Sequence, residues 1–415
     1  MIQQLENKTK FMLERFPVLK KSIKRCYQIF FCTITGSWKK TEGNIVRLSP
    51  KDGYEYFFGY YDKSPVDLTD RFILMNKAEK TYKEVAPKEP IELCVLDIVT
   101  NEITKINTVF SWNNQQGCMA QWLGPDFSKR IIYNDFRNGE YCSVVYNWEL
   151  KKEEGTIPSP IYDVSKDGKV ALALDFNRLH RLRPGYGYSN SNDHTKGQLC
   201  PEEYCIWKID LEKKTVEGLL KYTDFWNFEH DDSMDGAEHK VNHIMINPSG
   251  DRFMVIHRWL KNGKKRSRLI TINMDGSDMY NLSDDVYVSH CFWRDDKVII
   301  SFLRKKEYGD HYYLLKDKTG EYEMIWQSLV TDGHCSYSHD KRSIVTDTYP
   351  NRRRMSTIYA SKEGDDPKAL ARVFSPFKYD NECRCDLHPR WNYLDDKIFF
   401  DSAHEGKRAL YYIDY

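Results

Sequence analysis

The sequence lacks a long hydrophobic run. Hydrophobic residues make up 40 % of its 415 positions. However, the apolar stretch from Cys26 to Ile34 is too short for a membrane-spanning helix, which needs about 20 apolar residues. The N-terminus also lacks the early charged patch, apolar core and small-residue cleavage site of a secretory signal. Both absences indicate a cytoplasmic protein.

A disulfide framework and a zinc motif are also missing. The chain has 11 cysteines, and their only close spacings are Cys383-Arg-Cys385 and the pair Cys200 and Cys205. Neither spacing matches that of zinc ligands. Without an export signal, we expect these thiols to be reduced.

The chain has almost no net charge, which argues against a nucleic-acid partner. It carries 62 Lys and Arg against 61 Asp and Glu, whereas binding to a phosphate backbone needs an excess of positive charge. The charge is unevenly distributed, however. Residues 1–40 hold nine Lys and Arg against two Glu, a net of +7, and the remainder holds 53 against 59, a net of −6.

The basic segment, residues 1–40, is predicted to be helical, with Pro17 able to begin a helix. At helical spacing one stripe is apolar: Leu19, Ile23, Cys26, Tyr27, Phe30, Phe31 and Ile34. The residues off this stripe are basic: Lys20, Lys21, Lys24 and Arg25. Residues 17–35 are therefore expected either to lie on an anionic membrane face or to form a packed helix or solvated tail.

A repeated unit dominates the rest of the chain, residues 41–415. A polar turn followed by a β-rich run occurs seven times, with the turns beginning at Ser64, Gly124, Ser165, Asn247, Arg294, Ser338 and Leu394. Repeats of about 40–50 residues with alternating strands are typical of propeller blades. The sequence therefore predicts an all-β fold, a seven-bladed β-propeller. An early strand near Ile45 is expected to close the ring against the last strand, Arg408 to Tyr415.

Four histidines occupy the same place in four successive repeats: His243, His290, His334 and His388. Each precedes an apolar or aromatic residue by three positions (Ile246, Trp293, Tyr337 and Trp391). Equivalent positions of a circular repeat converge, so we expect a ring of imidazoles on the channel that can hold an ion or a substrate. The alternative is that each imidazole packs against the next blade and bonds a backbone carbonyl.

Further polar residues are expected near this ring. His239 precedes His243 by four residues, and Asp386 and Arg390 flank His388. Candidates from loops that follow second strands are His257, Arg258, His404 and Arg408. A long polar insertion, residues 175–190, is predicted to bind substrate, because arginine pairs with carboxylates and tyrosine faces stack on sugars. Its candidates are Arg178, Arg183, Tyr186 and Tyr188. Gln121 is a further candidate, and Tyr60, Tyr61 and Asp62 are weaker ones.

The C-terminal part, about residues 235–415, resembles the oligogalacturonate lyase type of seven-bladed propeller. The shared motifs are His243 with Asn-Pro-Ser-Gly, Ile256-His-Arg-Trp, Ile272-Asn-Met-Asp-Gly-Ser, Ser289-His-Cys-Phe-Trp, Gly333-His, His388-Pro and Phe400-Asp-Ser-Ala-His-Glu-Gly. The first 230 residues match this family only in the spacing of their repeats. The whole chain is also similar to uncharacterised propellers found beside glycosyltransferases in gene clusters for bacterial surface (capsular) polysaccharides.

The resemblance implies a divalent metal, typically Mn²⁺. His290 and His388 would be ligands with His334 joining them, and His243 or His257 would be the base. The sequence departs from the family where Arg390 replaces one ligand histidine and Cys385 replaces a glutamine. Asp386 is then expected to compensate as a ligand.

The implied reaction is β-elimination on a uronic-acid glycan, either a surface polysaccharide or its precursor. The charge that develops when C5 loses its proton needs stabilisation, for which Arg390 is the first candidate and Arg258 the second. Two other functions remain open. One is a glycoside hydrolase or transferase using carboxylates, namely Asp347, Asp386, Asp401 and Glu405. The other is a non-catalytic glycan-binding or scaffold propeller in polysaccharide assembly.

Overall fold

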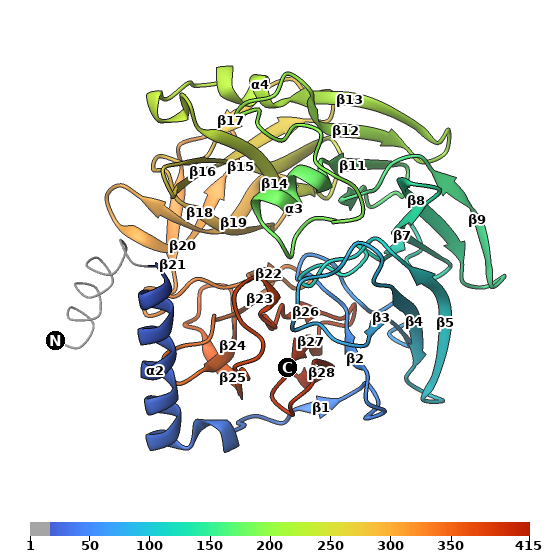
Figure 1. Ribbon diagram of the computed structural model, residues 1–415, viewed down its shortest axis with the longest axis vertical. Helices are drawn as coiled ribbons and strands as arrows, with labels where there is room; N and C mark the ends of the chain where they lie inside the picture. Colours follow the sequence, from blue (N-terminus) through green and yellow to red (C-terminus); the bar gives the residue numbers. More distant parts are fainter. Residues whose placement is uncertain (1–16) are drawn as a thin grey trace.

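The computed structural model describes residues 17–415 (Figure 1). The first 16 residues of the predicted basic segment lie outside the described range. Within residues 17–415 the strands form seven four-stranded antiparallel sheets around a common centre, which confirms the predicted seven-bladed propeller.

Blades 1 to 4 use consecutive strands. Blade 1 contains β2 (Glu55–Phe57), β3 (Phe72–Ala78), β4 (Ile91–Asp97) and β5 (Glu102–Val109). Blade 2 contains β6 (Gln121–Leu123), β7 (Arg130–Arg137), β8 (Glu140–Asn147) and β9 (Lys152–Ile157). Blade 3 contains β10 (Asp163–Val164), β11 (Val170–Leu174), β12 (Tyr204–Asp210) and β13 (Thr215–Lys221). Blade 4 contains β14 (Glu238–Ile246), β15 (Arg252–Lys261), β16 (Lys264–Asn273) and β17 (Tyr280–Asn281).

Blades 5 and 6 follow the same order, and blade 7 joins the two ends of the propeller. Blade 5 contains β18 (Val288–Trp293), β19 (Val298–Lys305), β20 (Gly309–Lys316) and β21 (Tyr322–Ile325). Blade 6 contains β22 (Ser336–Tyr337), β23 (Ser343–Asp347), β24 (Met355–Lys362) and β25 (Lys368–Phe374). Blade 7 contains β26 (Arg390–Trp391), β27 (Lys397–Ser402), β28 (Ala409–Asp414) and, as its outer strand, β1 (Val46–Arg47).

The pairing of β1 with β28 confirms the expected ring closure. Val46 lies opposite Tyr412 in an antiparallel register, and the Leu48 amide donates to the Leu410 carbonyl at 3.0 Å. The strand that begins the propeller therefore completes its last blade, which removes an unpaired sheet edge.

In two repeats, the tryptophan three positions after the ring histidine forms a hydrogen bond with the preceding blade. The indole N–H of Trp293 donates to the Met245 carbonyl of the preceding blade at 3.0 Å, and that of Trp391 reaches the Ser336 carbonyl at 3.5 Å. Both indoles are buried. In these two of the four repeats, the spacing in the sequence therefore corresponds to a hydrogen bond between blades.

The helices lie outside the sheets. They are α2 (Pro17–Thr35), α3 (Phe176–Leu182), α4 (Tyr222–Asn227) and the short 3-10 helices η2 (Ser37–Lys39), η3 (Asp232–Met234) and η4 (Asn381–Cys383). The long helix α2 runs beside blade 6 at the edge of the propeller (Figure 1). Among the described residues, no helix combines the length and apolar character needed to cross a membrane.

Candidate functional site

The four repeated histidines converge as expected. His243 lies on β14 and His290 on β18, while His334 and His388 immediately precede β22 and β26. The imidazole centroids of His290 and His334 are 4.1 Å apart, those of His334 and His388 are 4.3 Å apart, and those of His243 and His290 are 6.5 Å apart. All four side chains are buried.

Two tyrosine hydroxyls form hydrogen bonds with the imidazole of His243. Its Nδ1 lies 3.2 Å from the Tyr60 hydroxyl, and its Nε2 lies 2.9 Å from the Tyr61 hydroxyl and 3.1 Å from the Cys291 carbonyl. Burial lowers the pKa of His243 to about 4, so the ring is neutral. Because both of its nitrogens have partners, His243 positions the tyrosines in this structure and offers no free lone pair to a substrate. The expected role of His243 as a base is therefore not supported.

Two other imidazoles each keep one nitrogen free. Nδ1 of His388 donates to the Gly59 carbonyl at 2.8 Å, and Nδ1 of His334 lies 2.8 Å from a carboxylate oxygen of Asp347. The Nε2 atoms of both rings are buried without a hydrogen-bond partner. A histidine whose Nδ1 is held by a carbonyl or carboxylate presents an oriented Nε2 lone pair, which is the usual arrangement of a metal-binding imidazole.

Asp347 organises this pair. Its carboxylate accepts the backbone N–H of His334 at 2.8 Å and that of His388 at 3.1 Å, in addition to the contact with the His334 ring. Burial alone would raise the pKa of Asp347, but the charge and hydrogen bonds of His334 outweigh burial and lower it. The same partnership raises the pKa of His334 against the effect of burial.

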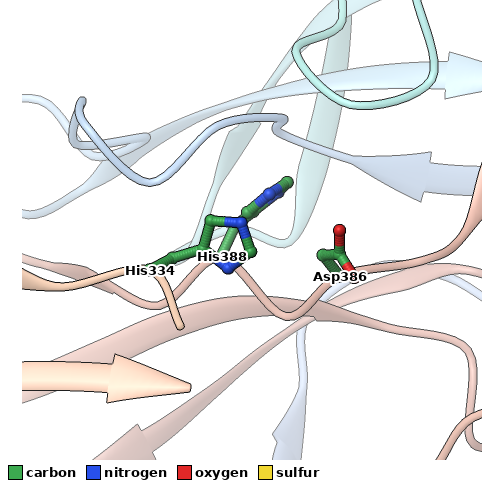
Figure 2. A group of neighbouring side chains, drawn as sticks. All are labelled: His334, Asp386 and His388. Atoms are coloured by element: carbon green, nitrogen blue, oxygen red, sulfur yellow. The ribbon is translucent and has the colours of Figure 1, made fainter. Parts of the chain in front are cut away.

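His334, Asp386 and His388 form a group that fits a divalent cation. Each offers one ligand atom, and these atoms all lie within 4.8 Å of one another (Figure 2). Asp386 is oriented by an ion pair with Arg384, one of whose contacts is 2.9 Å. Two unpartnered imidazole nitrogens beside a carboxylate are a donor set suited to Mn²⁺, Fe²⁺ or Zn²⁺. Three of the four expected ligands are thus brought together.

The fourth expected ligand, His290, lies beside this group with a different environment. Its Nδ1 is 2.9 Å from a carboxylate oxygen of Asp332, and its Nε2 is 3.4 Å from the Tyr349 hydroxyl. Burial, followed by repulsion from His334 and His243, lowers the pKa of His290 well below its usual value. His290 is therefore a neutral, carboxylate-oriented imidazole whose Nε2 faces a tyrosine.

Positive charge gathers around the insertion. Burial and the nearby Arg183 lower the pKa of Arg258 to about 10, and Arg258 together with burial lowers the pKa of Lys265 to about 7. Burial, followed by Arg183 and Arg258, also lowers the pKa of Lys240. Cations that lower one another's pKa values in this way repel one another, and a bound anion would relieve that repulsion.

Tyrosine rings lie beside these cations. The cations Arg183, Lys240, Arg258 and Lys265 are called the cationic layer below. The Arg183 guanidinium lies 4.1 Å from the centroid of the Tyr186 ring, and that of Arg384 lies 4.2 Å from the Tyr349 ring. The ring centroids of Tyr186 and Tyr60 are 6.0 Å apart, and the Tyr60 hydroxyl contacts His243, so the cationic layer adjoins the imidazoles. The expectation that Arg183, Tyr186 and Arg258 lie close to the histidine ring agrees with this geometry.

Arg390 does not have the expected freedom. Its guanidinium donates to the carbonyls of Tyr60 at 2.9 Å and Gly59 at 2.6 Å, and it lies 3.2 Å from Asp401. Arg408 binds the same carboxylate at 2.7 Å. Both arginines are fully buried. Arg390 and Arg408 are thus parts of an internal ion cluster, so the expected roles of Arg390 in stabilising charge at C5 and of Arg408 in substrate binding are not supported.

His239 and His257 form a separate buried pair. Nδ1 of His239 and Nε2 of His257 are 2.9 Å apart, and Arg268 lies 3.2 Å from Nδ1 of His257. Nε2 of His239 contacts the Met234 carbonyl at 3.1 Å. Every ring nitrogen of this pair has a partner, so the expected roles of His257 as base and of His239 in substrate binding are not supported.

The remaining candidates also lie apart from the imidazoles. Arg178 is fully buried and donates to the His239 carbonyl at 2.7 Å and to other groups of the insertion. Tyr188 stacks on Phe176 with centroids 4.4 Å apart. Nδ1 of His404 is 2.8 Å from the Ser402 hydroxyl. These residues support the fold locally.

Gln121 lines a different cavity. This cavity has a volume of about 230 Å³ and is bordered by turns such as that at Pro248, and neither Arg183 nor Tyr186 contributes to it. Gln121 is therefore not part of the cationic layer.

Some residues of the site carried little sequence signal. Asp332, Tyr349 and Arg384 stand in loops outside the seven repeated turns, and tyrosine is abundant in the chain, with 28 copies. The one available signal was the spacing Asp332-Gly-His334, which places an acid two residues before a ring histidine. The sequence indicates Asp347 only as a candidate catalytic carboxylate.

Comparison with known proteins supports the fold. No protein-family model matches the chain, and no curated protein matches it. Among solved structures, the chain is similar to an oligogalacturonate lyase in complex with manganese, at 17 % identity and a TM-score of 0.64 over 91 % of this chain and 94 % of that one. It is also similar to an oligogalacturonate lyase from Vibrio parahaemolyticus, at 14 % identity and a TM-score of 0.61, covering 90 % and 96 % of the two chains.

Propellers of other proteins are similar as well. The propeller domain of the Trilobed protease from Pyrococcus furiosus has 12 % identity and a TM-score of 0.50, with 87 % of this chain and 96 % of that one covered. The protein is thus a seven-bladed propeller with the overall fold of the oligogalacturonate lyase structures. At these identities the similarity establishes the fold, and function has to be argued from the site.

Proposed function

We propose that the protein is a lyase that cleaves a uronic-acid-containing glycan by β-elimination, with a divalent cation held by His334, His388 and Asp386. The observation that carries the proposal is the pair of buried, unpartnered Nε2 atoms beside a carboxylate. The likeness to an oligogalacturonate lyase in complex with manganese makes Mn²⁺ the first metal to test.

The cationic layer would bind the glycan. Arg183 and Arg258 carry the positive charge that pairs with uronic carboxylates, and the faces of Tyr186 and Tyr349 suit the flat sides of sugar rings. Around Lys240 and Lys265 the charges of Arg183 and Arg258, together with burial, outweigh the nearby acids and lower the pKa of both lysines, which favours an anionic substrate over a neutral one.

His290 is the best-placed base. Its Nδ1 is held by Asp332, and its Nε2 faces the Tyr349 hydroxyl at 3.4 Å, a long contact that a substrate would replace, so the neutral ring would accept the C5 proton. The electrons left on C5 would form a C4–C5 double bond as the C4–oxygen bond breaks, and the departing oxygen would take a proton from water to leave as a hydroxyl. A divalent cation at the neighbouring group would supply positive charge for the substrate carboxylate during this step.

The carboxylate-based alternative is less compatible with the structure. Asp401 is bound by Arg390 and Arg408, and Asp347 is bound by His334 and His388. Glu405 lies 2.6 Å from Arg47 in an ion pair of its own. A hydrolase needs two carboxyl groups facing one sugar, and these carboxylates are engaged elsewhere.

Two measurements test the proposal. Elemental analysis should find a stoichiometric divalent cation in the wild-type protein and in His404→Ala, and should find it lost in His334→Ala and His388→Ala. With polygalacturonate, the ultraviolet absorbance of an unsaturated product should rise, and His290→Ala should abolish this rise while retaining the metal.

Other outcomes would be equally informative. Equal metal content in all four proteins, or none in any, would refute the metal site. Glycan binding without an unsaturated product, in a metal-loaded protein and across several uronic-acid glycans, would refute the lyase activity and favour a binding propeller.

A further inference from the structure

The helix α2 contacts the propeller with its polar side. Gln28 is 5 % exposed and Cys32 is fully buried, and the Cys32 thiol lies 3.3 Å from the Arg353 carbonyl. Arg25 forms an ion pair with Asp380 at 2.7 Å. The helix is therefore fixed to the propeller by polar contacts and by a small apolar contact of Cys32 with Met355, Phe374 and Phe377.

The opposite side of α2 is apolar and exposed. Leu19, Ile23, Phe30 and Ile34 are 50 %, 41 %, 57 % and 65 % exposed. Separations of four, eleven and fifteen residues from Leu19 place them on one stripe of the helix. Trp38, in η2 just beyond the helix, is 44 % exposed. Of the seven residues of the predicted stripe, these four and Cys26 are exposed, whereas Tyr27 and Phe31 are half-buried, so the exposed stripe is narrower than the sequence predicted.

The surroundings of this stripe are basic. Residues 17–41 contain six Lys and Arg and no acidic residue. Lys21, Lys39 and Lys40 are exposed, and the Arg352 guanidinium lies 4.9 Å from the Phe31 ring on α2. The rest of the chain has a net negative charge, so the positive charge is concentrated where the exposed apolar side chains are.

We propose that α2 docks the protein onto an anionic membrane surface, with the stripe of Leu19, Ile23, Phe30 and Ile34 inserted among the lipid headgroups. Lys39 and Lys40, just beyond the end of the helix, would lie at the level of the lipid phosphates, and Trp38 suits the same interfacial zone. The helix runs along the outer edge of the propeller, away from the centre where the blades converge (Figure 1). A membrane explains both the apolar side chains and the cations, whereas a purely apolar partner would explain only the first.

The test uses the full chain and sedimentation with lipid vesicles. Vesicles of phosphatidylcholine with phosphatidylglycerol should bind the protein at least tenfold more tightly than vesicles of phosphatidylcholine alone, and added salt should weaken the binding. Phe30→Ser/Ile34→Ser should reduce binding at least tenfold. The control Val99→Ser/Leu150→Ser changes two residues that are 70 % and 60 % exposed on other blades and should bind as the wild type does.

Folding and self-association are checked in parallel. Because Phe30 and Ile34 are exposed, the serine variant should keep the circular dichroism spectrum of the wild type. The absence of binding to anionic vesicles at low salt would overturn the proposal. So would a dimer, seen by light scattering, that dissociates in Phe30→Ser/Ile34→Ser, because a second copy would then cover the stripe. Metal content and glycan cleavage do not enter this test, so its outcome is independent of the lyase proposal.

Discussion

The carboxylate of Asp347 fixes two imidazoles from neighbouring blades at once. It accepts the backbone N–H groups of His334 and His388 and also holds Nδ1 of His334. An asparagine at this position has the same shape but only one acceptor oxygen, so its NH₂ group would face a backbone N–H or the imidazole. The directions of both Nε2 lone pairs depend on this single side chain.

We therefore predict that Asp347→Asn weakens Mn²⁺ binding by about 10- to 100-fold, the usual effect of removing a group that orients a metal ligand. Isothermal titration with Mn²⁺ measures the change. Asp366→Asn, at an exposed position in the same blade, is the matched control and should bind as the wild type does. An unchanged affinity in Asp347→Asn would show that the two histidines do not bind the cation together.

Lys265 gives the site a pH dependence. Its pKa is lowered to about 7, first by the charge of Arg258 and then by burial. A lysine is positive below its pKa, so Lys265 loses its charge as the pH rises through about 7. One charge near an anionic ligand contributes about 1 kcal/mol at a protein surface, roughly fivefold in affinity.

Binding of polygalacturonate should accordingly weaken by roughly fivefold as the pH rises through about 7. In Lys265→Arg the cation persists, and this step in affinity should disappear. Lys264→Arg changes the adjacent lysine, which is exposed like Lys265, and should leave the step in place. A step that survives in Lys265→Arg would assign the titration to another group.

At the scale of the secondary-structure elements, the local pattern was sufficient for the strands but not for the direction of their side chains. The seven turns and the closing strand were predictable because strand period and turn chemistry are local. His257 and Arg258 are adjacent on β15 and point to opposite faces. The pairings of His257 with Val241 and of Arg258 with Lys240 place only Arg258 in the cationic layer. Which face looks inward is decided by the packing of whole blades.

The insertion, residues 175–190, is a second case in which the sequence does not show the direction of a side chain. Its Arg178 suggested substrate binding, but Asp175 caps α3 by accepting the Arg178 amide at 2.9 Å, and the helix directs the Arg178 side chain inward. There the guanidinium donates to carbonyls of His239, Thr195, Gln198 and Leu199. Arg178 thus ties the insertion to blade 4, while Arg183, one residue beyond α3, joins the site.

Replacing Arg178 should loosen the insertion. Arg178→Gln would leave several buried carbonyls without donors, and each such group costs about 1–3 kcal/mol. Hydrogen exchange of residues 183–200 should become at least tenfold faster, with little change in the blades. Arg181→Gln removes a partly exposed ion pair with Asp193 and should have a much smaller effect. Equal effects of the two substitutions would contradict the anchoring role of Arg178.

At the scale of the whole molecule, an ion cluster joins the last blade to the first. Asp401 on β27 binds Arg390 at 3.2 Å and Arg408 at 2.7 Å, and it accepts the Phe58 amide of blade 1 at 3.1 Å. Arg390 reaches two further blade 1 carbonyls, those of Gly59 and Tyr60. The predicted ring closure already places blade 1 beside blade 7, but the sequence does not show which side chains meet there, so the charged residues beside a ring histidine suggested chemistry.

This cluster makes ring closure sensitive to one carboxylate. Asp401→Asn leaves two buried guanidinium groups without a counter-charge, which destabilises a protein by about 3–5 kcal/mol. The urea midpoint should fall accordingly, while Asp414→Asn, exposed at the end of β28, should leave it unchanged. The triple variant Asp401→Leu/Arg390→Met/Arg408→Met removes all three charges together and should recover more than half of the lost stability, because no charge stays buried unpaired. A triple variant less stable than Asp401→Asn would instead show that the arginine bonds to the blade 1 carbonyls, and not the balance of charge, hold the ring closed.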